Sequence, residues 1–266
     1  MAVHPYISIC SGAGGLDIGV ERGSGGKAQC IVYIERELTA AATLVSNITQ
    51  GTLADAPIWS DIKTFDFAAW RGQVEGIVGG YPCQPFSTVG GRLGEADPRN
   101  LWPYIEAGIK AVRPVWCFFE NVSGHLNLGF DIVAESLLSM GYELAATLVS
   151  AESVRASHHR ERLFILAYSS GNRRKEKTFS VPRTSSRPAV KVERRERFAP
   201  GPKNDGWMDV PRGLQPSLLK SEFHRLDDGM GAWVDLSRQD RLRIAGNGVV
   251  PDAAAVAWRE LWEAIG

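Results

Sequence analysis

The chain has 266 residues, is 44% hydrophobic and carries no net charge, because 30 Lys and Arg residues balance 30 Asp and Glu residues. This size allows one domain with a substantial core and a small appended region, and it argues against two domains of typical size. No segment approaches the ~20 apolar residues that cross a membrane, and no basic stretch followed by an apolar one opens the chain, so we expect a soluble, cytoplasmic protein.

Apolar runs rich in β-forming residues predict six buried strands. Helix-like periodicity lies between several of them, and this alternation is typical of parallel strands joined by crossover helices. We therefore expect an α/β fold with a doubly wound, mostly parallel sheet that binds its ligand beyond the carboxyl ends of the strands. The predicted strands are Tyr6–Cys10, Gln29–Ile34, Gly76–Val78, Val115–Phe119, Leu144–Val149 and Leu163–Tyr168, and the predicted helices are Leu38–Ile48, Leu101–Val112, Ile132–Met140 and Pro251–Ile265.

The first strand leads into a glycine-rich turn, which lets a small ligand approach the backbone before a helix begins. Asp17 stands where the dinucleotide-binding fingerprint needs its third glycine, so nicotinamide and flavin binding are disfavoured. A tight strand-to-helix turn without any ligand is the alternative. The turn residues that we expect at a ligand are Ser11, Gly12, Ala13, Gly14, Gly15 and Leu16.

Two acidic residues further along the chain, Glu35 and Asp61, are candidates for contacts with the same ligand. Glu35 comes directly after the second predicted strand, where a carboxylate can accept both hydroxyl hydrogens of a ribose. Asp61 is placed to accept a hydrogen bond from an adenine amino group in the same cleft. Taken singly, each acid fits a surface charge or a helix cap better. Together with the glycine-rich turn they predict a nucleoside site.

The segment after the third predicted strand, residues 79–87, places a thiol on a constrained loop. Two prolines flank Cys83 and Gln84 and restrict the backbone, and the polar stretch that follows to Asn100 is long enough for a mobile lid. An isolated cysteine is usually a small buried hydrophobe. Its position at the carboxyl end of a strand favours a functional thiol instead.

Glu120 ends a strongly apolar strand, so we expect it in a partly desolvated place. Desolvation raises the pKa of a carboxyl group. A carboxyl group held near its pKa can donate a proton to a ring nitrogen as a general acid. A strand-terminal cap that faces water is the alternative.

The four cysteines, at positions 10, 30, 83 and 117, form no Cys-x-x-Cys pair, and no histidine cluster accompanies them. This pattern fits neither a disulfide framework nor a structural zinc site. We expect reduced thiols and no bound metal.

After Tyr168 the regular pattern gives way to a stretch rich in Ser, Pro, Gly and Arg. Between Gly171 and Arg225 there are 14 Lys and Arg against 6 Asp and Glu, a net charge of +8, which leaves −8 for the rest of the chain. Composition alone fits a solvated linker as well as a polyanion-binding surface. We predict one domain from residues 1–168 and 235–266, with residues 169–234 inserted in it.

These features, in this order, resemble the DNA cytosine-5 methyltransferases, in particular short members of phage or restriction-modification type. The resemblance rests on the glycine-rich turn, Pro-Cys-Gln at 82–84, Glu-Asn-Val at 120–122, Arg-x-Arg at 160–162 and Gly-Asn-x-Val at 246–249. It covers residues 6–168 and 235–266. The basic insert then stands where that family keeps its target-recognition region.

The resemblance implies transfer of a methyl group from S-adenosylmethionine to a flipped-out cytosine of double-stranded DNA, by a monomer that needs no metal. It makes Cys83 the nucleophile, Glu120 the acid at the cytosine ring, and Arg160 and Arg162 the anchors of the base and the catalytic loop. Further cofactor contacts are expected from Arg36, Ile62, Pro82, Asn247 and Val249, and DNA contacts from Gln84, Ser87, Arg99, Arg173, Arg174, Arg194, Arg195 and Arg197.

The chain departs from the family pattern at several positions. Cys10 and Arg36 stand where aromatic or apolar residues commonly contact the cofactor, which predicts modest affinity or contacts from other side chains. His158 replaces the usual glutamine before Arg160. The long arginine-rich motif near the end of the recognition region is not recognisable, which favours a reduced member of the family.

Two alternatives remain open. One is an RNA cytosine-5 methyltransferase on the same scaffold, acting on transfer RNA; the Cys-Phe-Thr-like element of that branch is missing between Val122 and Ser150. The other is a catalytically silent DNA-binding relative, against which the intact set of Cys83, Glu120, Arg160 and Arg162 argues.

Overall fold

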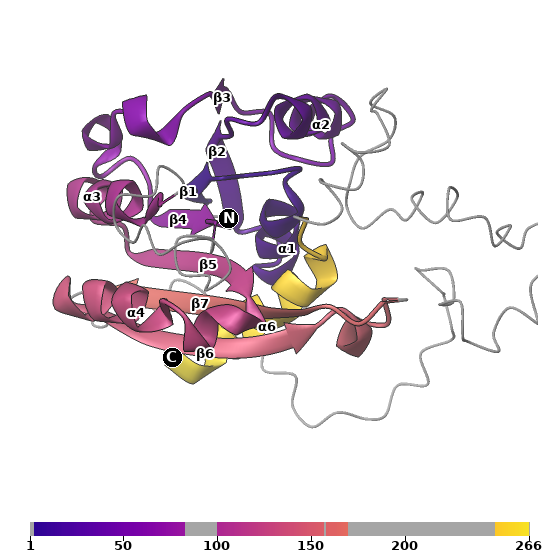
Figure 1. Cartoon of the computed structure of the whole chain (residues 1–266). Coiled ribbons are helices and arrows are strands. Elements are labelled where there is room, and N and C mark those ends of the chain that lie inside the picture. The colour runs from indigo at the N-terminus through magenta and orange to yellow at the C-terminus, as the bar shows by residue number, and fades with distance from the viewer. Residues whose placement is uncertain (1–2, 83–99, 157, 170–247, 266) are drawn as a thin grey trace, which may run out of the picture.

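A seven-stranded sheet forms the centre of the molecule (Figure 1). The structure, a computed structural model, describes residues 3–82, 100–156, 158–169 and 248–265. The strands lie in the order β3-β2-β1-β4-β5-β7-β6. Their bounds are β1 His4–Ile9, β2 Ala28–Ile34, β3 Ile58–Trp59, β4 Gly76–Gly79, β5 Trp116–Val122, β6 Tyr142–Ser150 and β7 Glu161–Ser169.

The sheet is mostly parallel, as predicted. The five strands from β3 to β5 run parallel, whereas β7 pairs antiparallel with both β5 and β6. The connection between Ser150 and Glu161 is too short for a crossover helix, so β6 and β7 form an antiparallel pair. The chain leaves β1 towards β2 and β3 and returns on its other side at β4. The carboxyl ends of β1 and β4 therefore form the switch point of a doubly wound sheet, where such folds bind ligands.

Helices cover both faces of the sheet. On one face, α1 (Gly15–Gly23), α2 (Leu38–Thr49) and α6 (Pro251–Ile265) share a core with alternate strand residues; on the other, α3 (Trp102–Val112) and α4 (Phe130–Ser139) do so. Residues in β5 show this alternation. Trp116 and Phe118 pack edge-on against Trp258 of α6, with ring centroids 5.0 and 5.1 Å away, whereas Phe119 belongs to the α3 side.

Helix α6 brings the end of the chain back to its beginning. A Cβ atom at Gly19 of α1 would lie 2.4 Å from the Cβ atom of Ala254 and 2.7 Å from the Pro251 carbonyl oxygen, so only glycine allows this approach. Arg22 Nη1 and Asp252 Oδ1 form an ion pair of 3.0 Å between the same helices. The segment before α6 is thereby held against the glycine-rich turn.

The predicted elements agree with the structure to within a few residues. Pro251–Ile265 has the predicted bounds, but the first strand ends at Ile9 rather than Cys10, and β5 continues past Phe119 to Val122. This extension occurs because Glu120, Asn121 and Val122 pair with β7. The two-residue strand β3 was not predicted. In the part of the chain that the structure describes, no helix has the length and apolar character of a membrane span.

Candidate active site

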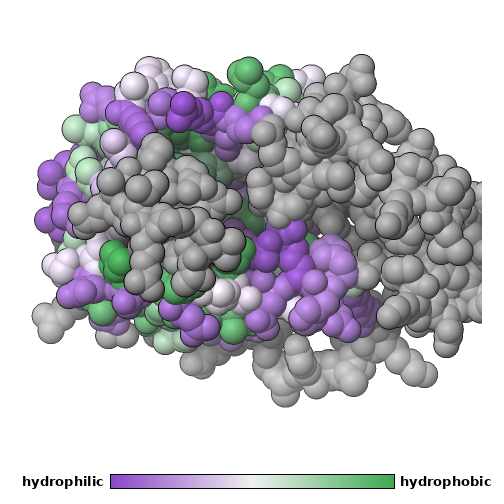
Figure 2. Space-filling model, in the orientation of Figure 1, coloured by the Kyte–Doolittle hydropathy of each residue, from purple (hydrophilic) through white to green (hydrophobic). Residues whose placement is uncertain are grey.

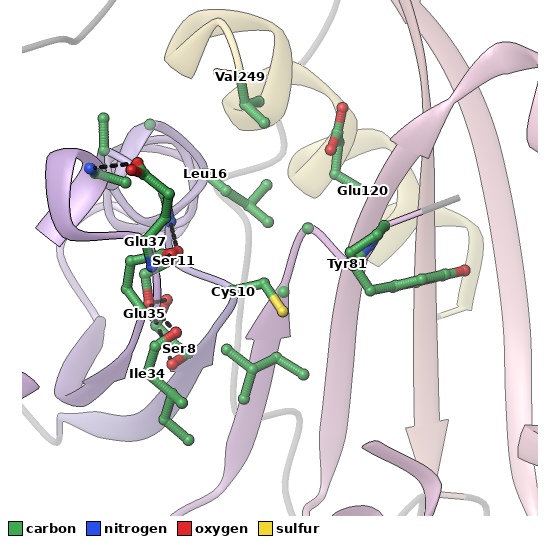
Figure 3. A pocket seen from close by; sticks show the side chains of 18 of the residues that line it. Ser8, Cys10, Ser11, Leu16, Ile34, Glu35, Glu37, Tyr81, Glu120 and Val249 are labelled. Atoms are coloured by element: carbon green, nitrogen blue, oxygen red, sulfur yellow. Dashed lines mark hydrogen bonds between the residues drawn. The ribbon is translucent and has the colours of Figure 1, made fainter. Parts of the chain in front are cut away.

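A cavity of about 540 Å³ opens at the switch point of the sheet, between the carboxyl ends of β1, β2, β4 and β5 (Figure 3). Figure 3 shows Glu35 and Glu120 on opposite walls with Cys10 between them. In the space-filling view (Figure 2), apolar side chains lie deep in a hollow whose visible rim is largely hydrophilic. Such a site, largely apolar with a few convergent polar groups, is typical of ligand pockets.

The glycine-rich turn forms one wall of this cavity. Cys10 leaves β1 with φ 49°, a left-handed conformation that is uncommon outside glycine, and Gly12 follows with φ 57°. A Cβ atom at Gly12 would meet no other atom within 4 Å. Since Gly12 lines the cavity, a ligand there can approach its backbone closely. At Gly15 a Cβ atom would lie 2.4 Å from the Val249 carbonyl oxygen, which requires glycine where the turn meets the chain before α6.

Glu35 ties this wall to the end of β2. Its Oε2 atom accepts a hydrogen bond from the Gly12 amide at 2.8 Å, and its Oε1 atom accepts one from the Glu37 amide at 2.7 Å. Each carboxylate oxygen can accept a second bond. The side chain is therefore fixed in place and keeps the capacity to accept hydrogen bonds from two hydroxyl groups.

Asp61 and Ile62 line the same cavity. Asp61 Oδ1 accepts a hydrogen bond from the Lys63 amide at 3.0 Å and caps a short 3-10 helix, η1 (Ile62–Thr64). The helix cap that sequence reasoning weighed against a ligand contact is thus present. The cap uses one oxygen and leaves the other available to a ligand.

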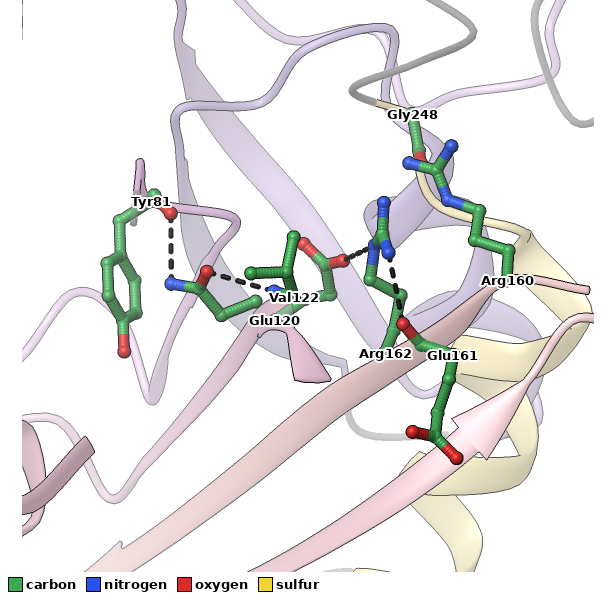
Figure 4. A network of polar contacts seen from close by, with 8 residues as sticks. Tyr81, Glu120, Val122, Arg160, Glu161, Arg162 and Gly248 are labelled. Atoms are coloured by element: carbon green, nitrogen blue, oxygen red, sulfur yellow. Dashed lines mark hydrogen bonds and ion pairs between the residues drawn. The ribbon is translucent and has the colours of Figure 1, made fainter. Parts of the chain in front are cut away.

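Glu120 and Arg162 form an ion pair at the opposite wall, with 2.9 Å between Oε1 and Nε (Figure 4). Glu120 is 7% exposed, and burial raises its pKa to about 7, although Arg162 and Arg160 both lower it. The predicted desolvation is therefore present. Because β5 runs on to Val122, however, Glu120 lies within the strand and is not its last residue.

Arg160 has another partner. Its guanidinium donates a hydrogen bond to the Gly248 carbonyl oxygen, at the start of the described segment before α6 (Figure 4). Arg162 and Gly248 both line the cavity, but Arg160 is not among its lining residues. The structure thus links Arg160 to the chain that returns to the glycine-rich turn, and its predicted contact with a base stays a prediction.

A second buried acid, Asp17, also lines the cavity. Asp17 of α1 is fully buried, and burial raises its pKa to about 7, while the nearby Ser8 and Tyr6 hydroxyl groups lower it only in part. Glu21 follows one turn later, and burial raises its pKa to about 7 as well. Burial on the same face of α1 therefore favours the protonated state of both acids.

Tyr81 and Asn121 are site residues that sequence reasoning missed. Asn121 Nδ2 donates to the Tyr81 carbonyl oxygen at 3.1 Å, and the Tyr81 hydroxyl lies 2.9 Å from His125 Nε2 (Figure 4 shows the first contact). Strand alternation is the signal that was available. With Glu120 on one face of β5, Asn121 must lie on the other.

Most of the predicted cofactor residues that the structure describes come together around the cavity. Gly14 is the exception, since it packs behind the turn against Leu44 and Leu53. The predicted site residues that line the cavity are Ser11, Gly12, Ala13, Gly15, Leu16, Glu35, Arg36, Asp61, Ile62, Pro82, Glu120, Arg162 and Val249. The predicted residues that lie outside the described ones are Cys83, Gln84, Ser87, Arg99, Arg173, Arg174, Arg194, Arg195, Arg197 and Asn247.

Among residues 3–82, 100–156, 158–169 and 248–265, no three His, Cys, Asp or Glu side chains are grouped to hold a metal ion. Cys30 and Cys117 are buried and free.

Solved structures with similar folds include a methyltransferase of Entamoeba histolytica, EhMeth, with a TM-score of 0.66 at 14% identity over the full length of both chains. A mutant form of DNMT2 of Spodoptera frugiperda has a TM-score of 0.54 at 20% identity, over 65% of this chain and 52% of that one. Identities this low support a common fold alone.

Sequence comparison is more specific. A type II methyltransferase of a Psychrobacter species, M.PspPI, is 34% identical over 62% of this chain, and M.NgoPII of Neisseria gonorrhoeae is 31% identical over 68%. The chain spans only 41% and 51% of these two relatives, whereas it spans 91% of M.AquIA of a Picosynechococcus strain, at 28% identity. The profile of the C-5 cytosine-specific DNA methylases matches residues 5–205. The chain belongs to this family.

Proposed function

We propose that this protein transfers the methyl group of S-adenosylmethionine to C5 of a cytosine in double-stranded DNA. One observation carries the proposal: the glycine-rich turn with Glu35 and the Glu120–Arg162 pair line one cavity. A nucleoside-binding wall and a buried acid therefore face the same space. Family membership supports the same reaction.

The described residues fit S-adenosylmethionine. The bare backbone at Gly12 can approach a ligand closely, Glu35 can accept hydrogen bonds from ribose hydroxyl groups, and the free oxygen of Asp61 can accept one from an adenine amino group. The cofactor supplies an electrophilic methyl group when bound. Asn247 is proposed to close this site beside Val249.

Glu120 is proposed to hold the target base and to donate a proton to its ring nitrogen. With a pKa of about 7, its carboxyl group is protonated in a large share of molecules at neutral pH. Arg162 fixes the orientation of this carboxyl group through the bond to Oε1. A second hydrogen bond from an arginine would hold the polar edge of the base, which has to leave the duplex to reach this depth.

Cys83 is proposed to add to cytosine C6 as a thiolate. Addition moves electron density to C5, which would then take the methyl group as its bond to the sulfonium sulfur breaks and S-adenosylhomocysteine leaves; loss of the C5 proton to a base expels the thiolate and restores the aromatic ring. Glu120 protonation of the ring nitrogen makes C6 more electrophilic. This order of steps needs no metal ion.

Residues 169–234 are proposed as the target-recognition region, inserted in a catalytic domain formed by residues 1–168 and 235–266. The net charge of +8 between Gly171 and Arg225 supports contact with phosphate groups, since Lys and Arg residues that neutralise phosphates supply a large share of the affinity of proteins for DNA.

Bisulfite sequencing of DNA from cells that express the protein tests this function. We expect methylated cytosines in one sequence context, none with Cys83→Ser, and no gain of 5-methylcytosine in transfer RNA from the same cells. Methylation confined to RNA would overturn the choice of substrate. Binding to DNA without methylation of either nucleic acid would favour the silent relative.

A further inference from the structure

Tyr81 is held at three points although it lies at the entrance to the catalytic loop. Its ring packs among Trp102, Phe119 and His125, with centroids 5.4, 5.8 and 5.5 Å away. Its hydroxyl lies 2.9 Å from His125 Nε2, and its carbonyl oxygen accepts the bond from Asn121. In Figure 3 the ring points away from the cavity while its main chain borders it. The residue is thus anchored from outside the cavity.

Both members of the hydroxyl–imidazole pair are buried. Tyr81 is 4% exposed and His125 is 1% exposed, so both polar groups lose water when they are buried. A phenylalanine would fill the same aromatic cluster without that cost. A buried pair of polar groups contributes through its geometry, because each group stays satisfied in one arrangement only. The pair therefore fixes the position of Tyr81 more narrowly than packing does.

We propose that Tyr81 and His125 are positioning residues, which hold the chain leading into Cys83 at a set distance from Glu120. Cys83 is two residues from Tyr81, with Pro82 between them. Asn121, which binds the Tyr81 carbonyl, is the neighbour of Glu120 in β5. The end of β5 therefore has two roles. Glu120 is the acid, and Asn121 holds the start of the loop that carries Cys83.

The reaction needs this precision because Cys83 and Glu120 have to act on the same ring. Misplacement of a reacting group by about 1 Å costs roughly 100-fold in rate. The inference deepens the proposed function and rests on it. Loss of the Tyr81–His125 contact should therefore slow the methyl-transfer step and leave cofactor binding unchanged.

Tyr81→Phe is the direct test, because it removes one hydroxyl and keeps the ring. Tyr142→Phe is the matched control: its hydroxyl is also buried and donates to the Pro114 carbonyl oxygen at 2.7 Å, and neither residue lines the cavity. Single-turnover methyl transfer to DNA and calorimetric affinity for S-adenosylmethionine would be measured for both. We expect Tyr81→Phe to lower the transfer rate at least tenfold and Tyr142→Phe to lower it less than twofold, with cofactor affinity unchanged in both.

Two variants of His125 separate positioning from stability. His125→Gln offers an amide near the place of Nε2, whereas His125→Leu offers no polar group, so we expect the first to retain much more of the transfer rate at equal Tm. An active wild type with unchanged rates in Tyr81→Phe and His125→Leu would overturn this inference alone. A folded wild type that methylates no DNA would overturn it together with the proposed function.

Discussion

Glu120 of β5 and Arg162 of β7 are diagonal neighbours on two paired antiparallel strands, and their 2.9 Å ion pair lies in the wall of the cavity. Two opposing effects act on the acid: burial raises its pKa and the guanidinium lowers it. The outcome, a pKa of about 7, leaves Glu120 able to give up and regain a proton near neutral pH.

We predict that the rate of methyl transfer falls as pH rises above about 7, because ionised Glu120 no longer donates a proton. Glu120→Gln should be at least ~100-fold slower and should lack this falling limb. Arg162→Gln should move the limb to higher pH, since it removes a charge that lowers the pKa of Glu120. Single-turnover rates between pH 6 and 9 measure this. The same falling limb in Glu120→Gln would assign the titration to another group.

The two acids on the side of the cavity formed by the glycine-rich turn, Glu35 and Asp61, give a prediction with a closely matched control. Asp61→Ala should weaken binding of S-adenosylmethionine by about 1–3 kcal/mol, because a ligand group loses its partner, and so should Glu35→Ala. Asp66→Ala removes a cap of the same kind, from Asp66 Oδ1 to the Ala68 amide at 3.1 Å, but Asp66 does not line the cavity. Titration calorimetry should find its affinity unchanged. Equal losses in Asp61→Ala and Asp66→Ala would show that the cap matters and the ligand contact does not.

Asp17 should make stability depend on pH. Its folded pKa of about 7 lies above the unfolded value of about 4, so the stabilisation is complete below pH 4 and is lost as pH rises to 7. The loss is on the order of 1.4 kcal/mol per pH unit. Asp17→Asn removes this dependence, and its free energy of unfolding should exceed the wild-type value by more at pH 8 than at pH 5. Glu263→Gln, the same kind of exchange at an exposed position, is the control. Parallel curves for Asp17→Asn and wild type would contradict the assignment.

Sequence patterns predicted the helices and the parallel strands well, because their apolar periodicity reflects burial on two faces of one sheet. They also predicted that Glu35 and Asp61 share a cavity with the glycine-rich turn, since the carboxyl ends of parallel strands lie at one edge of a sheet. They missed the partner of Arg160, because its bond to Gly248 joins segments 88 residues apart and depends on how α6 packs on α1. They missed Tyr81 and His125 for a similar reason: neither residue type stands out until the fold places them 2.9 Å apart.

The charge of the insert gives a prediction that depends on salt. DNA affinity should fall as the salt concentration rises. Each phosphate contact should add roughly one log unit of affinity lost per log unit of salt. Replacing Arg194, Arg195 and Arg197 with alanine should therefore flatten the salt dependence and weaken binding. Fluorescence anisotropy at several salt concentrations measures both. If slope and affinity stay unchanged, these arginines belong to a solvated linker, and sequence choice has to come from the loop after Cys83 and residues 205–233.

The most direct test of the account is covalent trapping of Cys83. In duplex DNA that contains 5-fluorocytosine, C5 carries no proton to lose, so the thiolate cannot be expelled after methyl transfer. We predict a protein–DNA adduct that forms only with S-adenosylmethionine, carries the added methyl group and maps by mass spectrometry to Cys83; Cys83→Ser should form none. Methylation of ordinary DNA without such an adduct, or an adduct at another residue, would contradict the account.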